Sequence, residues 1–266
     1  MHPIEQLRFV ARASGADASL LVQEAASALS VFAHDRPGLV TAARRLLTRQ
    51  PAIGPLWWMC HRMVLSDDPR LEARSVIEDL RQDRTGRNLA HELPDGATVV
   101  IVGWPDTIVE ALPRRGDVTV LVVDVEGQGP AAVCRLERAD VIAEEVAAEH
   151  LGGAVTEASL VLIEAAAAGP AAALTDVGSL AAAATARAVG TPTWTVAGVG
   201  RMLPEVYWQQ VAERTTNLDE PAWLAAHEVV ATGLIDRVVT GVGVMKPDEA
   251  EPDTVGIAPE LLKALG

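Results

Sequence analysis

The sequence predicts an α/β fold, in which an N-terminal helical domain precedes a Rossmann-like, doubly wound parallel sheet. Two observations lead to this prediction. Apolar residues recur at helical spacing through the first third of the chain, whereas from Thr98 onward short β-branched runs alternate with helical segments. The change falls at Pro94, Asp95 and Gly96, a turn sequence, so we expect domains at residues 1–92 and 93–266.

The N-terminal domain shows no pattern typical of a strand. Its helices are expected at residues 4–32 with a break at 14–15, at 39–47, at 56–64 and at 67–91.

The second domain contains continuous apolar runs, which are typical of strands buried on both faces of a parallel sheet. These strands are expected at residues 98–102, 118–125, 140–142, 159–163 and 193–196. Helices are expected between them at residues 107–112, 131–136, 144–150 and 179–189. In doubly wound sheets ligands bind beyond the carboxyl ends of the strands. The loops of interest are therefore residues 103–106, 126–130, 164–176 and 197–203.

None of these loops carries a dinucleotide-binding G-x-G-x-x-G or a phosphate-binding G-x-x-x-x-G-K-[ST] sequence, so no cofactor is expected. The two cysteines have no spacing typical of a zinc site, so no metal is expected either.

The charge of the chain argues against direct binding of nucleic acid. The 266 residues carry a formal net charge of −14, which repels a phosphate backbone. The densest basic cluster is Arg44, Arg45 and Arg49, which is more typical of a solvated helix face. The first residues lack a basic region followed by an apolar run, and no segment has the features of a membrane span. A cytoplasmic location without membrane contact is expected.

Several short motifs follow one another in a distinctive order. They are R-Q-P-A-I-G-P-L (49–56), S-L-V-L-I-E (159–164), D-V-G-S (176–179), V-G-T-P-T-W-T-V (189–196) and V-G-I-A-P-E-L-L (255–262). This order resembles the family that holds the regulatory α, β and δ subunits of translation initiation factor 2B. That family also contains methylthioribose-1-phosphate isomerase and ribose-1,5-bisphosphate isomerase. The resemblance implies a helical domain joined to a Rossmann-like domain, and a homodimer built through the latter.

The catalytic residues of the family's isomerases are replaced in this chain. The resemblance places Gly103 where they carry a catalytic Cys, Ala173 where they carry a catalytic Asp, and Ala166 at the Asp of their G-A-D motif. Gly and Ala side chains cannot transfer a proton or act as a nucleophile. Asp176 falls at the family's Lys position, and its charge would repel a sugar phosphate by up to about 1 kcal/mol in water.

Glu164 and Asp176 border the altered segment and are candidate ligand-binding residues. Two interpretations of Asp176 stay open: it belongs to a polar site, or it caps the helix that begins near Ser179.

Four further residues are candidates for the same site. Gly103 and Trp104 lie in the loop after the first strand, where Trp104 could stack on a planar ligand or fill the vacated pocket. Arg201 follows the fifth strand, and it could contact an anion or pair with Glu205. Arg49 matches the family's Arg in the helical-domain loop and keeps an enzymatic function open.

Three functions remain possible from the sequence. The preferred one is a non-catalytic relative that binds a small phosphorylated or nucleotide-like ligand, or a protein partner, as a homo-oligomer. The second is a sugar-phosphate aldose–ketose isomerase with relocated catalytic residues. The third is an assembly subunit without a ligand.

Overall fold

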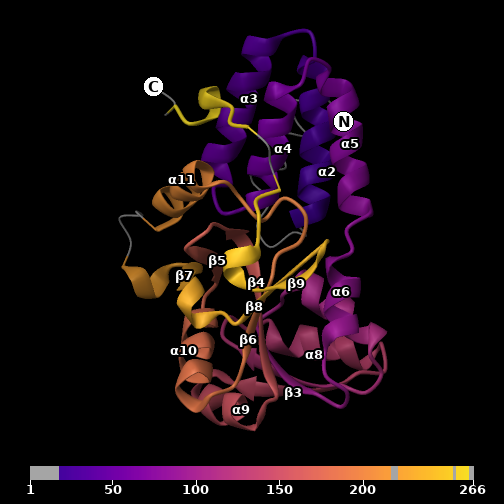
Figure 1. Ribbon diagram of the computed structural model, residues 1–266, viewed down its shortest axis with the longest axis vertical. Coiled ribbons are helices and arrows are strands. Elements are labelled where there is room, and N and C mark those ends of the chain that lie inside the picture. The colour runs from indigo at the N-terminus through magenta and orange to yellow at the C-terminus, as the bar shows by residue number, and fades with distance from the viewer. Residues whose placement is uncertain (1–17, 217–220, 254–255, 264–266) are drawn as a thin grey trace.

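A computed structural model of the chain describes residues 18–216, 221–253 and 256–263. The N-terminal helices stack at one end of the molecule, and the sheet with its flanking helices forms the other end (Figure 1). The helices of the first part are α2 (Ala18–Leu29), α3 (Arg36–Arg49), α4 (Gly54–Leu65), α5 (Pro69–Arg81) and α6 (Thr85–Glu92). No strand occurs among residues 18–92, as predicted, while the helix expected at residues 4–13 lies outside the described residues.

The single helix expected at residues 67–91 is wrong, because the chain breaks between α5 and α6. Asp83 causes the break: its Oδ1 accepts hydrogen bonds from Thr85 N at 2.8 Å and from Thr85 Oγ1 at 2.6 Å. Such local side-chain bonds compete with the helical ladder and begin a new helix. Asp83 Oδ2 accepts a third bond from Val199 N at 3.0 Å, which joins this break to the loop after strand β6 (Thr193–Val196).

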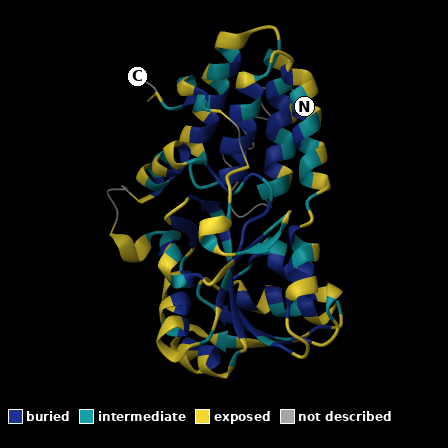
Figure 2. Ribbon diagram, viewed as in Figure 1, coloured by how far each residue is buried: buried dark blue, intermediate teal, exposed yellow. Residues whose placement is uncertain are grey.

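The hydrophobic core around α4 includes residues from much later in the chain. Trp57 is fully buried, and its ring lies 5.8 Å from that of Tyr207, on α11 (Glu205–Thr216). The Tyr207 hydroxyl contacts His61 Nδ1 and accepts from Ala258 N, both at 2.7 Å, which holds the C-terminal segment against the helices. Figure 2 shows buried positions running continuously from the helical end into the sheet. Because this core joins the helices to the later part of the chain, the division into domains at residues 1–92 and 93–266 stays a prediction.

The main sheet has the order β3-β2-β1-β4-β6-β8-β9, and its neighbouring strands are parallel except for β8 and β9. Its strands are β1 (Thr98–Val102), β2 (Thr119–Asp124), β3 (Ile142–Ala147), β4 (Leu160–Ala168), β6 (Thr193–Val196), β8 (Arg237–Thr240) and β9 (Gly243–Met245). The order reverses between β1 and β4, which makes this pair the topological switch point.

Helices cover both faces of this sheet. On one face α6 packs with α7 (Asp106–Ala111) and α8 (Gly129–Glu137). On the other face α9 (Leu151–Glu157) packs with α10 (Ser179–Val189). The predicted α/β fold with a doubly wound parallel sheet is confirmed.

Two segments of the α/β part differ from expectation. Residues 144–147 belong to strand β3 and not to a helix, because six residues of β3 pair in register with β2 at the edge of the sheet. Glu144 and Glu145 lie exposed on this edge strand, where charge protects against edge-to-edge association. The helix expected at residues 144–150 is therefore wrong over residues 144–147, and helical structure begins only at Ala148.

The segment expected as a loop at residues 164–176 is a buried hairpin. β4 continues to Ala168 and turns back into β5 (Ala172–Asp176), which pairs with both β4 and β7 (His227–Ala231). Alanines allow this hairpin to pack tightly against α4: a Cβ on Gly54 would lie 2.8 Å from the Ala166 carbonyl oxygen. An Ala/Gly composition is often typical of a loop, but in this hairpin it allows close packing.

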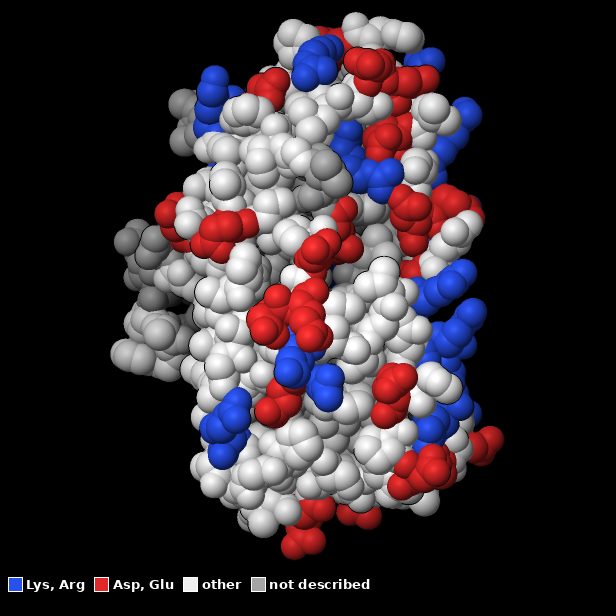
Figure 3. All heavy atoms as spheres, viewed as in Figure 1, with Lys and Arg blue, Asp and Glu red and all other residues white. Residues whose placement is uncertain are grey.

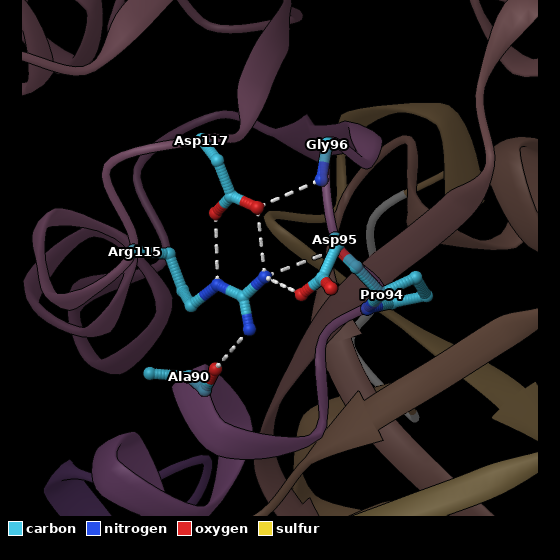
Figure 4. Close-up of polar contacts among 6 residues, drawn as sticks. All are labelled: Ala90, Pro94, Asp95, Gly96, Arg115 and Asp117. Carbon is cyan, nitrogen blue, oxygen red and sulfur yellow. Dashed lines mark hydrogen bonds and ion pairs between the residues drawn. The ribbon is translucent and has the colours of Figure 1, made fainter.

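A polar cluster fixes the amino-terminal edge of the sheet (Figure 4). Arg115 donates to both carboxylate oxygens of Asp117 at 2.9 Å and to Asp95 at 2.8 Å. Asp117 also accepts from Gly96 N at 2.8 Å, and these bonds lower the pKa of Asp117 to about 2. The cluster connects the turn before β1 with the turn before β2, and it lies at the edge opposite to the candidate site.

Candidate functional site

The candidate site lies at the carboxyl ends of β1 and β4, which is the switch point of the sheet. Val99 and Val100 pair with Leu160 and Val161, a register that brings Gly103 level with Glu164. Gly103 has a φ of +62°, in the left-handed region that disfavours other residues. A side chain at this position would meet open space, so conformational strain and not crowding restricts it.

The Glu164 carboxylate binds the first turn of α7. Its Oε2 accepts from Thr107 N at 2.8 Å and more weakly from Ile108 N at 3.4 Å, and its Oε1 accepts from Thr107 Oγ1 at 2.7 Å. The Glu164 side chain is only 8% exposed. The N-terminus of a helix is a natural anion-binding site. In this chain that position is occupied by the chain's own carboxylate.

Arg201 completes the arrangement around Glu164. Its guanidinium Nη2 lies 2.8 Å from Glu164 Oε1, its side chain is 13% exposed, and its Nη1 donates to the Ala165 carbonyl. The predicted alternative, a surface pair between Arg201 and Glu205, is wrong, because Arg201 turns inward from the loop after β6. Its positive charge is largely balanced within the protein.

At this edge, carboxylates of the chain also accept hydrogen bonds from the N-termini of two more helices. Asp124, the last residue of β2, accepts from Gly129 N at 3.1 Å at the start of α8. Glu228 on β7 accepts from Leu180 N at the start of α10. Burial raises the pKa of Glu228, while backbone N–H groups of Leu180 and Gly178 act in the opposite direction. Glu228 therefore caps α10, and the alternative in which Asp176 performs this role is wrong.

Asp176 instead faces a histidine on β7, the strand that pairs with β5. It pairs with His227 of β7, and its Oδ1 lies 3.8 Å from His227 Nε2. The Asp176 side chain is 54% exposed. Desolvation raises the pKa of Asp176, and the nearby His227 and Arg201 partly offset that rise.

The remaining sequence-predicted residues take different positions. Trp104 is half-buried against the core beneath α7 and α8, and its Nε1 donates to Asp106 Oδ1 at 2.7 Å. It therefore fills space beside the switch point. Arg49 is the exposed last residue of α3, and it does not line the cleft that Thr107 and Arg201 share with α5 and α6. The structure thus gathers Gly103, Glu164 and Arg201, with Asp176 near Arg201.

Sequence reasoning missed three participants: Thr107, Asp124 and Glu228. Asp124 lies near the carboxyl end of the strand predicted at residues 118–125, a signal that could have been used. Glu228 meets Leu180 across 48 residues, so no local pattern indicates the contact.

Within the described ranges, no group of three or more His, Cys, Asp or Glu side chains could hold a metal ion. The same residues contain no helix of the length and hydrophobicity that a bilayer crossing requires.

Comparison with solved structures identifies related folds. Translation initiation factor eIF-2B from Pyrococcus horikoshii OT3 superposes with a TM-score of 0.76 and 13% identity, over 93% of this chain and 98% of that chain. The tetrameric eIF2B-beta2-delta2 complex from C. thermophilum gives a TM-score of 0.73 and 17% identity, over 93% and 92%. The 5-methylthioribose 1-phosphate isomerase from Pyrococcus horikoshii OT3 gives 0.67 and 15%, over 92% and 85%.

What the chain shares with these proteins is the fold. No model of a known protein family matches the sequence, and no curated protein matches it. The expected resemblance to the initiation factor 2B and isomerase group is confirmed at the level of structure. Since such folds carry different functions, activity has to be argued from the site.

Proposed function

We propose that this chain is a non-catalytic protein of the initiation factor 2B fold, which acts by binding a small ligand or a protein partner. The observation that carries this proposal is the Glu164 carboxylate on the N-terminus of α7. A negatively charged substrate at the switch point would have to displace it from Thr107 N and from Arg201. Repulsion between the two anions, in a site with little solvent, opposes that exchange.

The positions that would carry catalysis support the same proposal. Gly103 has no side chain, and Ala173 is buried within β5, where it pairs with Val230. Aldose–ketose isomerisation needs an acid and a base that move protons between neighbouring carbons. Neither position can supply one.

One observation favours the isomerase alternative. Asp176 has a raised pKa and lies beside His227, so among the described residues this pair offers an acid and a base near the sheet edge. In that alternative Asp176 would remove the proton and His227 would return it.

A turnover assay tests the proposal. Purified protein is incubated with ribose-1,5-bisphosphate or methylthioribose-1-phosphate, and NMR follows conversion of the sugar. We expect no conversion above background, because each missing acid or base contributes about 10²–10⁴-fold to the rate. Conversion at a rate typical of enzymes, abolished by Asp176→Asn, would establish the isomerase alternative. Glu145→Gln, a neutralised carboxylate on the far edge strand, serves as the matched control.

The proposal includes self-association and a cytoplasmic location. One structural relative is a tetrameric complex, and this chain shares its fold. We expect a homodimer at micromolar concentration, since most soluble oligomers are two-fold symmetric. Light scattering that finds only monomer at those concentrations would contradict this part of the proposal.

A further inference from the structure

A groove separate from the switch-point site lies between the helical part and the β8–β9 end of the main sheet. Its volume is about 1050 Å³. The residues that line it come from α4 and α5 on one side, and from the turn between β8 and β9 and residues 249–253 on the other. Gly103, Thr107, Glu164 and Arg201 do not line it. This volume is at the upper end of those typical of ligand sites, so the groove has room for a short peptide segment.

The lining of this groove is predominantly acidic. Six carboxylates line it: Glu72, Asp79, Asp83, Glu249, Glu251 and Asp253. The two arginines of the lining, Arg62 and Arg84, do not balance them. Arg62 is already bound by Glu72 and Asp79, each at 2.5 Å, and Arg84 is exposed. Figure 3 shows acidic side chains gathered across the middle of the molecule, between the helical end and the sheet end.

Asp253 carries part of this uncompensated charge. Its Oδ2 accepts from Gly200 N at 2.8 Å and from Met202 N at 3.3 Å. Burial and the nearby Asp83 carboxylate nevertheless raise the pKa of Asp253 to about 6, and no cationic side chain of the described residues offsets that rise. A positive charge brought into the groove by another molecule would therefore stabilise the ionised carboxylate.

Apolar side chains lie exposed on both sides of the groove. Val242, in the turn between β8 and β9, is 88% exposed, and Leu65, the last residue of α4, is 42% exposed. Between them the wall includes the buried Trp58, whose Nε1 donates to the Asp253 carbonyl at 3.3 Å. Surfaces that combine exposed apolar residues with a polar rim are typical of protein–protein contacts.

We propose that this groove binds a basic peptide segment of a partner protein, in which Lys or Arg residues flank an apolar residue. The apolar residue contacts Leu65 and Val242, and the cationic groups meet Glu251 and Asp253. Charge complementarity favours this occupant and excludes acidic segments and nucleic acid, since like charges brought together at an interface oppose binding. This inference rests on the proposed function as a binding protein, and it names the chemistry of the partner.

Selection of a randomised peptide library against the full chain tests the assignment. Selected peptides are then synthesised, and their Kd is measured by fluorescence polarisation. We expect them to carry more Lys and Arg than Asp and Glu, together with a large apolar residue. Selection that yields no binder, or binders without this basic excess, would overturn the assignment.

Two variants with matched controls locate the binding site. Glu251→Lys is expected to raise the Kd of a selected peptide by about tenfold or more, because it places a like charge against the cationic groups. Val242→Ser should weaken binding severalfold by removing an apolar contact. Glu145→Lys on β3 and Val189→Ser at the end of α10 change exposed residues outside the groove and should leave the Kd unchanged. Circular dichroism confirms that each variant is folded, and equal effects of a groove variant and its control would contradict the assignment.

Two other occupants are distinguished by competition. Spermidine that displaces a selected peptide at a comparable concentration would show that charge alone is sufficient, and the assignment to a peptide would be wrong. Residues 1–17 of this chain, which include Arg8 and Arg12, are the second competitor. As a synthetic peptide they should compete no better than a scrambled peptide of the same composition, and specific displacement would assign the groove to this segment instead.

The outcome is separable from that of the turnover assay. Isomerase turnover with intact peptide binding would refute the proposed function alone. Absence of both turnover and peptide binding would refute this inference alone.

Discussion

Glu164→Ala is expected to destabilise the protein by about 3–5 kcal/mol, the cost of removing one partner from a buried ion pair. The substitution leaves Arg201 without its carboxylate and Thr107 N without an acceptor, in a region that is only 8–13% exposed. Urea unfolding followed by circular dichroism measures the loss. A change below about 1 kcal/mol would mean that solvent replaces the carboxylate and that the pair is not important for the fold.

Glu164→Gln is the matched control for this variant. The amide oxygen can still accept from Thr107 N, while the charge opposite Arg201 is lost. We expect an intermediate loss of stability. In addition, phosphate should stabilise Glu164→Ala more than the wild type, because the N-terminus of α7 is then open to an external anion.

Trp57→Ala is expected to cost about 3–5 kcal/mol, as truncation of a buried Trp does in other cores. The side chain is fully buried, and its Nε1 donates to the Pro51 carbonyl at 3.0 Å. Tyr207 lies against one side of the ring, and the Arg214 guanidinium lies 5.0 Å from the ring centre. Both partners come from α11, so the helical part and the α/β part should lose stability together in thermal and urea unfolding.

Trp57→Phe provides the comparison for that result. It keeps an aromatic ring against Tyr207 but removes the bond to Pro51, so the loss should be clearly smaller. Two separate unfolding transitions, of which Trp57→Ala lowers only that of the helices, would contradict this prediction. They would mean that the shared core does not couple the two parts.

The main sheet was largely predictable because its strands carry strong local signals. Residues 98–102 and 119–124 are continuous runs dominated by Val, and the structure forms β1 and β2 there. The hairpin of β4 and β5 was not predictable in the same way. Its alanines have no intrinsic preference for the β-strand conformation. They form strands because β7 pairs with β5 and α4 packs against the hairpin.

The candidate site was predicted in part. Glu164, Arg201 and Gly103 do converge, since the carboxyl ends of parallel strands meet at one edge. The role of Glu164 was not predictable, because it depends on Thr107, which lies 57 residues away in the chain. The same holds for Glu228 at α10. Contacts of this kind follow from the register between strands, which a single sequence does not specify.

Carboxylates of this chain occupy helix N-termini at the switch point, and we propose that they take the place of an anionic substrate. A crystal structure obtained in the presence of a high concentration of phosphate tests it most directly. We expect Glu164 to remain on Thr107 N and Arg201, with no anion at the start of α7. Phosphate bound at Thr107 N, with Glu164 rotated away from Arg201, would show instead that an external anion displaces the carboxylate.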